Sequence, residues 1–277
     1  MAKRAAVIND LSSFGKCSLT AFIPILSVMG HQPCPVPTAV LSSQSEFAHA
    51  YCKDLTEVMP QYLQAWQQSG ERFDAIATGY FAGGKQIDYA LQFIDAFGGN
   101  CFVAVDPVMG DNGEWYPAYD RAACRKMKAL ARRADVLLPN LTELCMLTDA
   151  DFFELTARCH EKDYFEQIAA LAKSVCAKQG VIVTGIAHEN DICNLVTDGA
   201  TTEIIRSHKI GERFSGTGDI FSAVVCGCLL SGKSLTEAAE AAARFTERAI
   251  ADTVGEPHNP MHGVNFEKNL YTLAEVK

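Results

Sequence analysis

The stretch FSGTGDIFSAVVCGCLL, residues 214–230, decides the fold, because glycines, Thr217 and Asp219 stand directly before a long apolar run. The run predicts a buried helix from Thr217 to about Leu230. A turn with an N-cap explains the polar start, since Gly permits unusual dihedrals and Asp is favoured where helices begin. An anion site also explains it, because N–H groups at a helix N-terminus can hold a phosphate or an oxyanion. Asp219 would repel a bound anion, so in that case its task is to accept a proton.

Upstream of this stretch, short β-rich runs alternate with longer helical patterns. The expected strands cover residues 4–9, 74–79, 101–107, 135–140 and 180–185. The expected helices lie within residues 16–30, 85–99, 119–134, 141–147 and 164–179. Apolar strands without clean alternation are typical of a parallel sheet covered on both faces, and the alternation with helices favours βαβ units. The sequence therefore predicts an α/β fold with a central, mostly parallel sheet and helices on both faces.

The pattern changes after residue 186. Residues 191–199 and 201–209 predict two strands joined by a turn that contains Asp198 and Gly199. A further helix is expected from Leu235 to about Ala251. No linker, repeat or low-complexity tract interrupts the chain, so we expect one domain over residues 1–277.

Composition limits the possible partners. The chain has 277 residues, is 48% hydrophobic and carries a formal net charge of -9, so it has little general attraction for nucleic acid or anionic lipid. The N-terminal residues resemble neither a signal peptide nor a membrane span. The eleven cysteines show no zinc-ligand spacing, Cys226 and Cys228 included. We expect reduced, mostly buried thiols in a cytoplasmic protein that binds neither nucleic acid nor membrane.

Polar residues follow the expected strands. In open parallel sheets, ligands bind beyond the carboxyl ends of the strands, so these residues are expected at one rim. They are Asn9, Asp10, Gly79, Tyr80, Asp106, Asn140 and Thr184. Asp10 with Ser12 and Ser13 could contact a polar substrate or cap the next helix. The Tyr80 ring could stack on a planar ligand or pack at the rim.

Two motifs carry carboxylates. In DPVMGDNG, residues 106–113, Asp106 and Asp111 could hold Mg²⁺ directly or through water, although such residues are also ordinary in loops. In LLPNLTELCML, residues 137–147, Asn140 and Glu143 have the spacing of a capping box. Glu143 could equally face a metal-bound water or a phosphate.

Several familiar motifs are missing from the sequence. It has no H-x-x-x-H zinc spacing, no G-x-S-x-G elbow and no G-x-x-x-x-G-K-[ST] phosphate loop. A G-x-G-x-x-G fingerprint after the first strand is also absent. A nucleotide enzyme with this sequence is therefore not of the P-loop type.

The remaining signals fall in one order: a polar cluster after the first strand, then TGY, DPVMGD, PNLTE, VTG and GTGD. That order, over nearly the whole chain, resembles the ribokinase-like superfamily. TGY at 78–80, DPVMGDNGEWY at 106–116 and PNLTE at 139–143 are most similar to the pyridoxal kinase family.

The resemblance implies ATP-dependent phosphorylation of a hydroxymethyl group on a pyridine ring. It makes Asp219 the catalytic base and Gly216, Thr217 and Gly218 the anion hole. It places Asp106, Asp111 and Glu143 in the cation and phosphate region, with Asn140 in the same motif. Tyr80 matches a ring contact and Thr184 a contact to nucleotide phosphate. The family implies Mg²⁺, often a monovalent cation such as K⁺, and commonly a homodimer.

The sequence departs from the family in places that bear on the substrate. Asp10 and Leu11 stand where pyridoxal kinases have a ring-binding serine, usually followed by a histidine. Ser45 could stand for a threonine of the family's next substrate segment, and Leu138 replaces a frequent threonine. Two alternatives therefore stay open. One is a hydroxymethylpyrimidine kinase, in which Asp10 suits an amino-bearing ring. The other is a non-catalytic vitamin-binding protein, which the intact GTGD disfavours.

Overall fold

A computed structural model describes residues 2–175 and 177–276. Within them nine strands form one sheet in the order β11-β10-β9-β8-β5-β4-β1-β2-β3. Their bounds are β1 (Arg4–Ser12), β2 (Gln32–Leu41), β3 (Cys52–Asp54), β4 (Ala75–Thr78), β5 (Phe102–Val105), β8 (Val136–Leu137), β9 (Gly180–His188), β10 (Asp191–Thr197) and β11 (Thr202–His208). The strands from β9 through β2 are parallel, whereas β10, β11 and β3 pair antiparallel at the two edges. A small separate hairpin joins β6 (Gly110–Asp111) to β7 (Glu114–Trp115).

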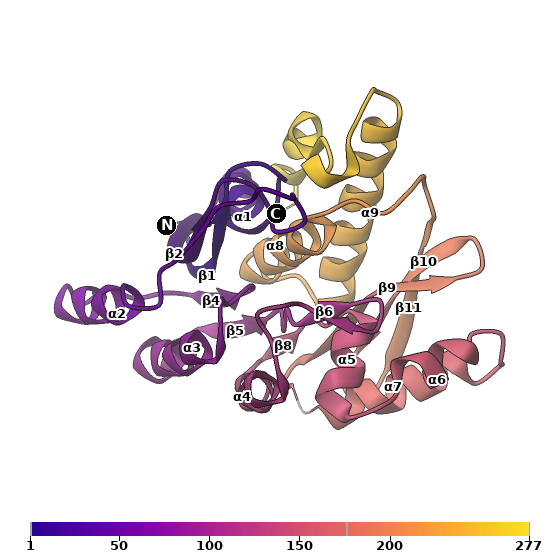
Figure 1. Cartoon of the computed structure of the whole chain (residues 1–277), viewed down its shortest axis with the longest axis horizontal. Coiled ribbons are helices and arrows are strands. Elements are labelled where there is room, and N and C mark those ends of the chain that lie inside the picture. The colour runs from indigo at the N-terminus through magenta and orange to yellow at the C-terminus, as the bar shows by residue number, and fades with distance from the viewer. Residues whose placement is uncertain (1, 176, 277) are drawn as a thin grey trace.

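Helices cover both faces of this sheet (Figure 1). One face carries α1 (Ser18–Val28), α8 (Thr217–Leu230), α9 (Leu235–Val254) and the 3₁₀ segment η3 (Phe266–Leu273). The other carries α2 (Met59–Gln68), α3 (Gly84–Phe97), α4 (Arg121–Ala131), α5 (Leu141–Thr148) and α7 (Tyr164–Ser174). Helix α6 (Phe152–Ala157) and the 3₁₀ turns η1 (Gly98–Asn100) and η2 (Pro260–His262) complete the elements. The predicted mostly parallel sheet with helices on both faces is confirmed.

The central strand β1 shows why the sheet is buried on both sides. Ala5 and Val7 pack toward α1 and α8, while Ala6 and Ile8 pack into the other half of the core. Every one of these side chains is apolar, so β1 lacks the polar alternation of a half-exposed strand. Helix α8 is buried on nearly all sides, as its continuous apolar run predicts.

Several element boundaries differ from the sequence prediction. Strand β1 continues to Ser12, so Asp10 lies inside the strand and not in a loop after it. The strand predicted at 135–140 is paired only over Val136–Leu137. The hairpin predicted over residues 191–209 is confirmed, with Asp198 accepting N–H groups in its turn. Residue 176 of the predicted 164–179 helix lies outside the described residues.

Strand β2 is an element that sequence reasoning missed, because Pro33, Pro35 and Pro37 argue against a strand. These prolines are alternate residues, so their missing N–H groups fall on one edge of β2. The opposite edge pairs with β1 from Gln32 onward, and β3 covers the outer edge only over Ala39–Leu41. Proline is tolerated where no neighbouring strand needs a donor.

Candidate active site

Asn9 joins three segments at the carboxyl edge of the sheet. Its Nδ2 donates to Asp219 Oδ1 at 3.0 Å, and its Oδ1 accepts the N–H groups of Asp10 at 3.0 Å and Tyr80 at 2.8 Å. Gly79 makes room for this side chain, since a Cβ there would lie 2.4 Å from the Asn9 amide nitrogen. Asn9 is expected at the rim from the sequence, but no role follows from the sequence alone. The available signal is an asparagine directly after the apolar run of the first strand.

Asp219 has the environment of a proton acceptor. Its side chain is partly exposed and also accepts the N–H of Ser18. Burial and the nearby charge of Asp10 raise the pKa of Asp219 to about 6, although the hydrogen bonds from Ser18 and Asn9 oppose the shift. The carboxylate is therefore ionised at neutral pH and still basic enough to take a proton.

The start of α8 leaves backbone N–H groups open. Gly216 precedes the helix with a φ of 80°, and a Cβ there would lie 2.6 Å from the carbonyl oxygen of Lys16. No side chain caps α8, and within residues 2–175 and 177–276 no protein acceptor receives the N–H groups of Thr217 and Gly218. The simpler interpretation, a turn with an N-cap, holds in part, because Gly216 is the N-cap residue but no side chain closes the turn. The geometry fits an anion cradle.

Asp10 is buried beside this centre. It accepts a hydrogen bond from Ser12 Oγ at 2.7 Å and another from the Ser18 side chain, while its burial raises its pKa. Its interpretation as a helix cap is wrong, because Cys17 is the N-cap residue of α1. Asp10 contributes to raising the pKa of Tyr80 to about 12, after burial and Cys52, so the predicted substrate residues Asp10 and Tyr80 do lie near each other.

Ser45, the third predicted substrate residue, is exposed in the loop between β2 and β3. Its neighbours Gln44 and Glu46 contact Met261 and Ser215. Ser45 itself forms no hydrogen bond with any other part of the described chain, so its substrate role stays a prediction.

Asp106 and Glu143 form a pair of neighbouring buried carboxyl groups. Asp106 accepts from Ser222 Oγ at 2.7 Å, while burial and the charge of Asp219 raise the pKa of Asp106 to about 7. Burial and Asp106 raise the pKa of Glu143 well above its usual range. Two carboxyl groups close enough for the charge of Asp106 to raise the pKa of Glu143 form a place where a cation is favoured.

Helix α5 begins with the capping box that the sequence predicts. Asn140 Oδ1 accepts the N–H of Glu143 at 2.9 Å, and Glu143 accepts the N–H groups of Asn140 at 2.8 Å and Met109 at 3.2 Å. Asn140 also donates to the carbonyl oxygen of Gly110 at 2.9 Å. Thr184 pairs with Asn140 in a parallel bridge, so the two predicted nucleotide residues are neighbours. Their nucleotide contacts stay a prediction.

Asp111 is engaged by an arginine. Its Oδ2 lies 2.5 Å from Arg213 Nη2, which is also 3.7 Å from Glu46 Oε1. In the described part of the chain, no three His, Cys, Asp or Glu side chains converge to hold a metal ion. Asp106, Asp111 and Glu143 therefore form no complete ligand set by themselves. The pair Asp106 and Glu143 fits Mg²⁺, which proteins usually hold through one or two carboxylates together with phosphate and water.

The segment 260–265, here called the brace, holds the two loops that border the α8 N-terminus. A Cβ on Gly263 would lie 2.4 Å from the carbonyl oxygen of Gly15, so the two backbones touch. Lys16 Nζ donates to Asn265 Oδ1 at 2.6 Å, and Ser215 N donates to the carbonyl oxygen of Pro260 at 3.3 Å. The brace thereby connects the loop after β1 with the loop before α8.

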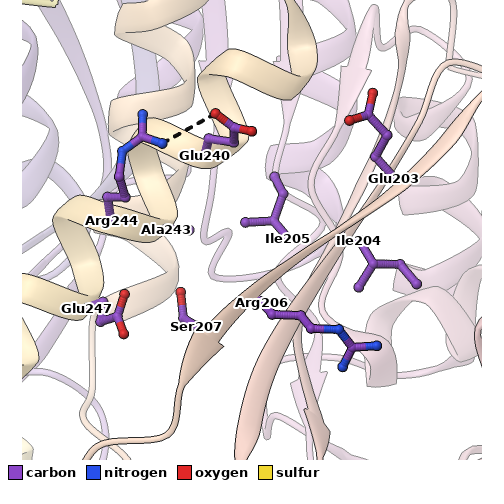
Figure 2. A pocket seen from close by; sticks show the side chains of 9 residues that line it. All are labelled: Glu203, Ile204, Ile205, Arg206, Ser207, Glu240, Ala243, Arg244 and Glu247. Atoms are coloured by element: carbon purple, nitrogen blue, oxygen red, sulfur yellow. Dashed lines mark hydrogen bonds and ion pairs between the residues drawn. The ribbon is translucent and has the colours of Figure 1, made fainter.

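A pocket of about 290 Å³ lies elsewhere, between β11 and α9 (Figure 2). Its lining includes Arg206, Ile205 and the ion pair of Arg244 with Glu240 at 3.3 Å. None of the residues described above lines it, so this pocket is separate from the candidate active site.

An acid at an open helix N-terminus, next to paired carboxylates, is the arrangement expected of a phosphotransferase with an alcohol group as acceptor. The chain belongs to the phosphomethylpyrimidine kinase family, which it matches over residues 19–262. This places it among the pyridoxal kinase-like proteins of the ribokinase-like superfamily, as the sequence motifs predict.

Individual relatives are named either as kinases of B6 vitamers or as kinases of hydroxymethylpyrimidine and its phosphate. A pyridoxine/pyridoxal/pyridoxamine kinase of Bordetella avium is 27% identical over 87% of this chain and 82% of its own. A hydroxymethylpyrimidine/phosphomethylpyrimidine kinase of Bacillus subtilis is 28% identical over 96% of both chains. A crystal structure from Bacteroides thetaiotaomicron, provisionally assigned as a phosphomethylpyrimidine kinase and containing pyridoxal, is 33% identical with a TM-score of 0.91, covering 99% of this chain and 96% of its own.

Among the described residues, no helix combines the length and the hydropathy that crossing a membrane requires.

Proposed function

We propose that the protein is an ATP-dependent kinase that phosphorylates the 5′-hydroxymethyl group of a B6 vitamer: pyridoxal, pyridoxine or pyridoxamine. The observation that carries this proposal is Asp219, held by Asn9 at the open N-terminus of α8. The pyridoxal in the Bacteroides thetaiotaomicron relative supports the substrate class.

In the proposed reaction Asp219 accepts the proton of the substrate hydroxyl. The alcohol oxygen forms a bond to the γ-phosphorus as the bond from that phosphorus to ADP breaks. The N–H groups at Gly216, Thr217 and Gly218 hold the oxygens of the transferring group. In this proposal Asp10 and Tyr80 contact the substrate ring, and Asn140 and Thr184 contact the nucleotide.

The proposed reaction uses Mg²⁺, which neutralises phosphate charge when bound. Asp106 and Glu143 are the residues that would hold it, and Asp111 could join them. A monovalent cation such as K⁺, a homodimer and a cytoplasmic location are part of the proposal through the family resemblance.

A hydroxymethylpyrimidine kinase is the second candidate. It is favoured by the Bacillus subtilis relative, which aligns over nearly the full length of both chains. Asp10 also suits it, because a buried carboxyl group can pair with a ring amino group.

A substrate panel tests both candidates. Formation of ADP and of the phosphorylated ring should be measured with the three B6 vitamers and with hydroxymethylpyrimidine at equal concentrations. We expect the highest kcat/KM with a B6 vitamer. A preference for hydroxymethylpyrimidine selects the second candidate, and no phosphorylated product from any of the four would contradict both.

A further inference from the structure

Arg213 lies where three segments around the active site meet. Its guanidinium contacts Asp111 in the β6–β7 hairpin and approaches Glu46 in the loop after β2. Ser215, in the same loop as Arg213, donates to Glu46 Oε2 at 2.8 Å. This loop leads directly into α8, whose N-terminus forms the anion cradle.

Arg213 is a cation at the edge of a group of acidic side chains. Asp219 raises the pKa of Asp106, and both Asp106 and Asp111 raise the pKa of Glu143, so these acidic groups form a continuous row that favours positive charge. The ionised members of this row would repel the triphosphate of ATP. Arg213 is in direct contact with this row, and a guanidinium binds phosphate oxygens in a bidentate manner.

The present partners of Arg213 do not hold it strongly. Its side chain is 56% exposed, and those of Asp111 and Glu46 are 26% and 46% exposed. Ion pairs that water can reach contribute little to stability, so exchanging one anionic partner for another is inexpensive.

We propose that Arg213 exchanges partners when the nucleotide binds. Without nucleotide its guanidinium pairs with Asp111 and Glu46; with ATP bound it moves to the β- or γ-phosphate. Asp111 is then free to face the cation. This inference rests on the proposed kinase function, because it assigns Arg213 to the phosphates of its nucleotide.

Binding measurements test the exchange. The dissociation constants of AMP, ADP and ATP should be determined by calorimetry in EDTA for the wild type, Arg213→Gln and Arg213→Lys. We expect Arg213→Gln to weaken ATP binding about tenfold to a hundredfold with AMP unchanged, and Arg213→Lys to lose less. Arg244→Gln is the matched control, since Arg244 is also exposed and paired with a glutamate (Figure 2). Equal losses for AMP and ATP, or unchanged ATP binding, would overturn the proposal.

Asp111→Asn supplies a second test, because it releases the guanidinium without removing it. ATP should bind this variant more tightly in EDTA, and the gain should vanish in the double variant with Arg213→Gln. A gain that persists there would reflect general electrostatics and overturn the exchange. Melting temperatures verify folding throughout. If the wild type binds ATP but phosphorylates none of the four rings, the proposed function fails while these binding results still decide the role of Arg213.

Discussion

At the scale of single residues, Asn9 fixes the position of the Asp219 carboxylate. One amide accepts from the N–H groups of Asp10 and Tyr80 and donates to the Asp219 carboxylate. Both ends of the amide are therefore engaged, which fixes its orientation. Asp219 keeps its other contact from the Ser18 N–H, so its position does not depend on a substrate being bound.

The first prediction concerns Asp219→Asn. The new amide oxygen can still accept from Asn9, so shape and ATP binding should persist while the base is lost. Removing general-base help typically lowers the rate by about 10²–10⁴-fold. Steady-state kcat on the best substrate, together with ATP affinity by calorimetry, measures the effect. Near-normal turnover would contradict the assignment of the base.

The pH dependence of kcat/KM should report the same carboxylate. Asp219 must be ionised to accept a proton, so activity should fall as the pH drops through about 6, the raised pKa of Asp219. The charge of Asp10 contributes to that shift, so Asp10→Asn should move the acid limb to lower pH. An acid limb that does not move in Asp10→Asn would contradict the described electrostatics.

Asp10 should also affect the choice between vitamers. Its buried carboxyl group gains most from a positively charged partner, and the aminomethyl group of pyridoxamine provides one. We expect Asp10→Ser to shift preference toward pyridoxal by about ten- to a hundredfold in relative kcat/KM. Both vitamers should be assayed with both proteins, and an unchanged ratio would remove Asp10 from the substrate site.

At the scale of elements, the start of α5 combines a structural task with a chemical one. Glu143 accepts two backbone N–H groups and also lies beside Asp106. Glu143→Gln can keep one of these acceptors but cannot become negatively charged when a cation binds. We expect a stability loss of about 1 kcal/mol and a higher Mg²⁺ requirement, measured by thermal unfolding and by Mg²⁺ titration of activity.

Glu237→Gln is the matched control for that variant. Glu237 closes the capping box of α9 with Ser234, away from the carboxylate row. The Glu237→Gln variant should lose a similar amount of stability, and its Mg²⁺ titration should be unchanged. If Glu143→Gln behaves like Glu237→Gln in both measurements, Glu143 is only a cap.

Some of the helices, strands and site residues could be predicted from the sequence, and others could not. The apolar runs, the α5 capping box and the polar residues at strand ends follow from local chemistry, so they could be predicted. Strand β2 was missed because its prolines are acceptable only beside an open edge, which depends on a neighbour. The contacts of Asn9 with Asp219 and of Arg213 with Asp111 join distant segments, and no local pattern encodes them.

At the scale of the whole molecule, the buried carboxyl groups should make stability depend on pH. Asp106 has a pKa near 3.8 when unfolded and about 7 when folded. The folded state thus holds a proton that the unfolded state releases between these values. The free energy of unfolding should therefore fall as the pH rises through this range and level off above about pH 7.

Asp106→Asn removes this dependence while keeping an acceptor for Ser222. We expect the variant to be more stable than the wild type at pH 8, by on the order of 2 kcal/mol, with a smaller difference near pH 4. Urea unfolding in EDTA at both pH values measures it. A difference that is the same at both pH values would contradict the raised pKa of Asp106.

The brace also determines when activity can first arise during synthesis. The ribosome releases β1 well before residues 260–265, and domains begin to fold as they emerge. A nascent chain can therefore bury much of its sheet before Gly263 reaches Gly15. Until then the loops on either side of Asp219 lack their common support. We therefore expect the nascent protein to acquire most of its fold before it acquires catalytic activity.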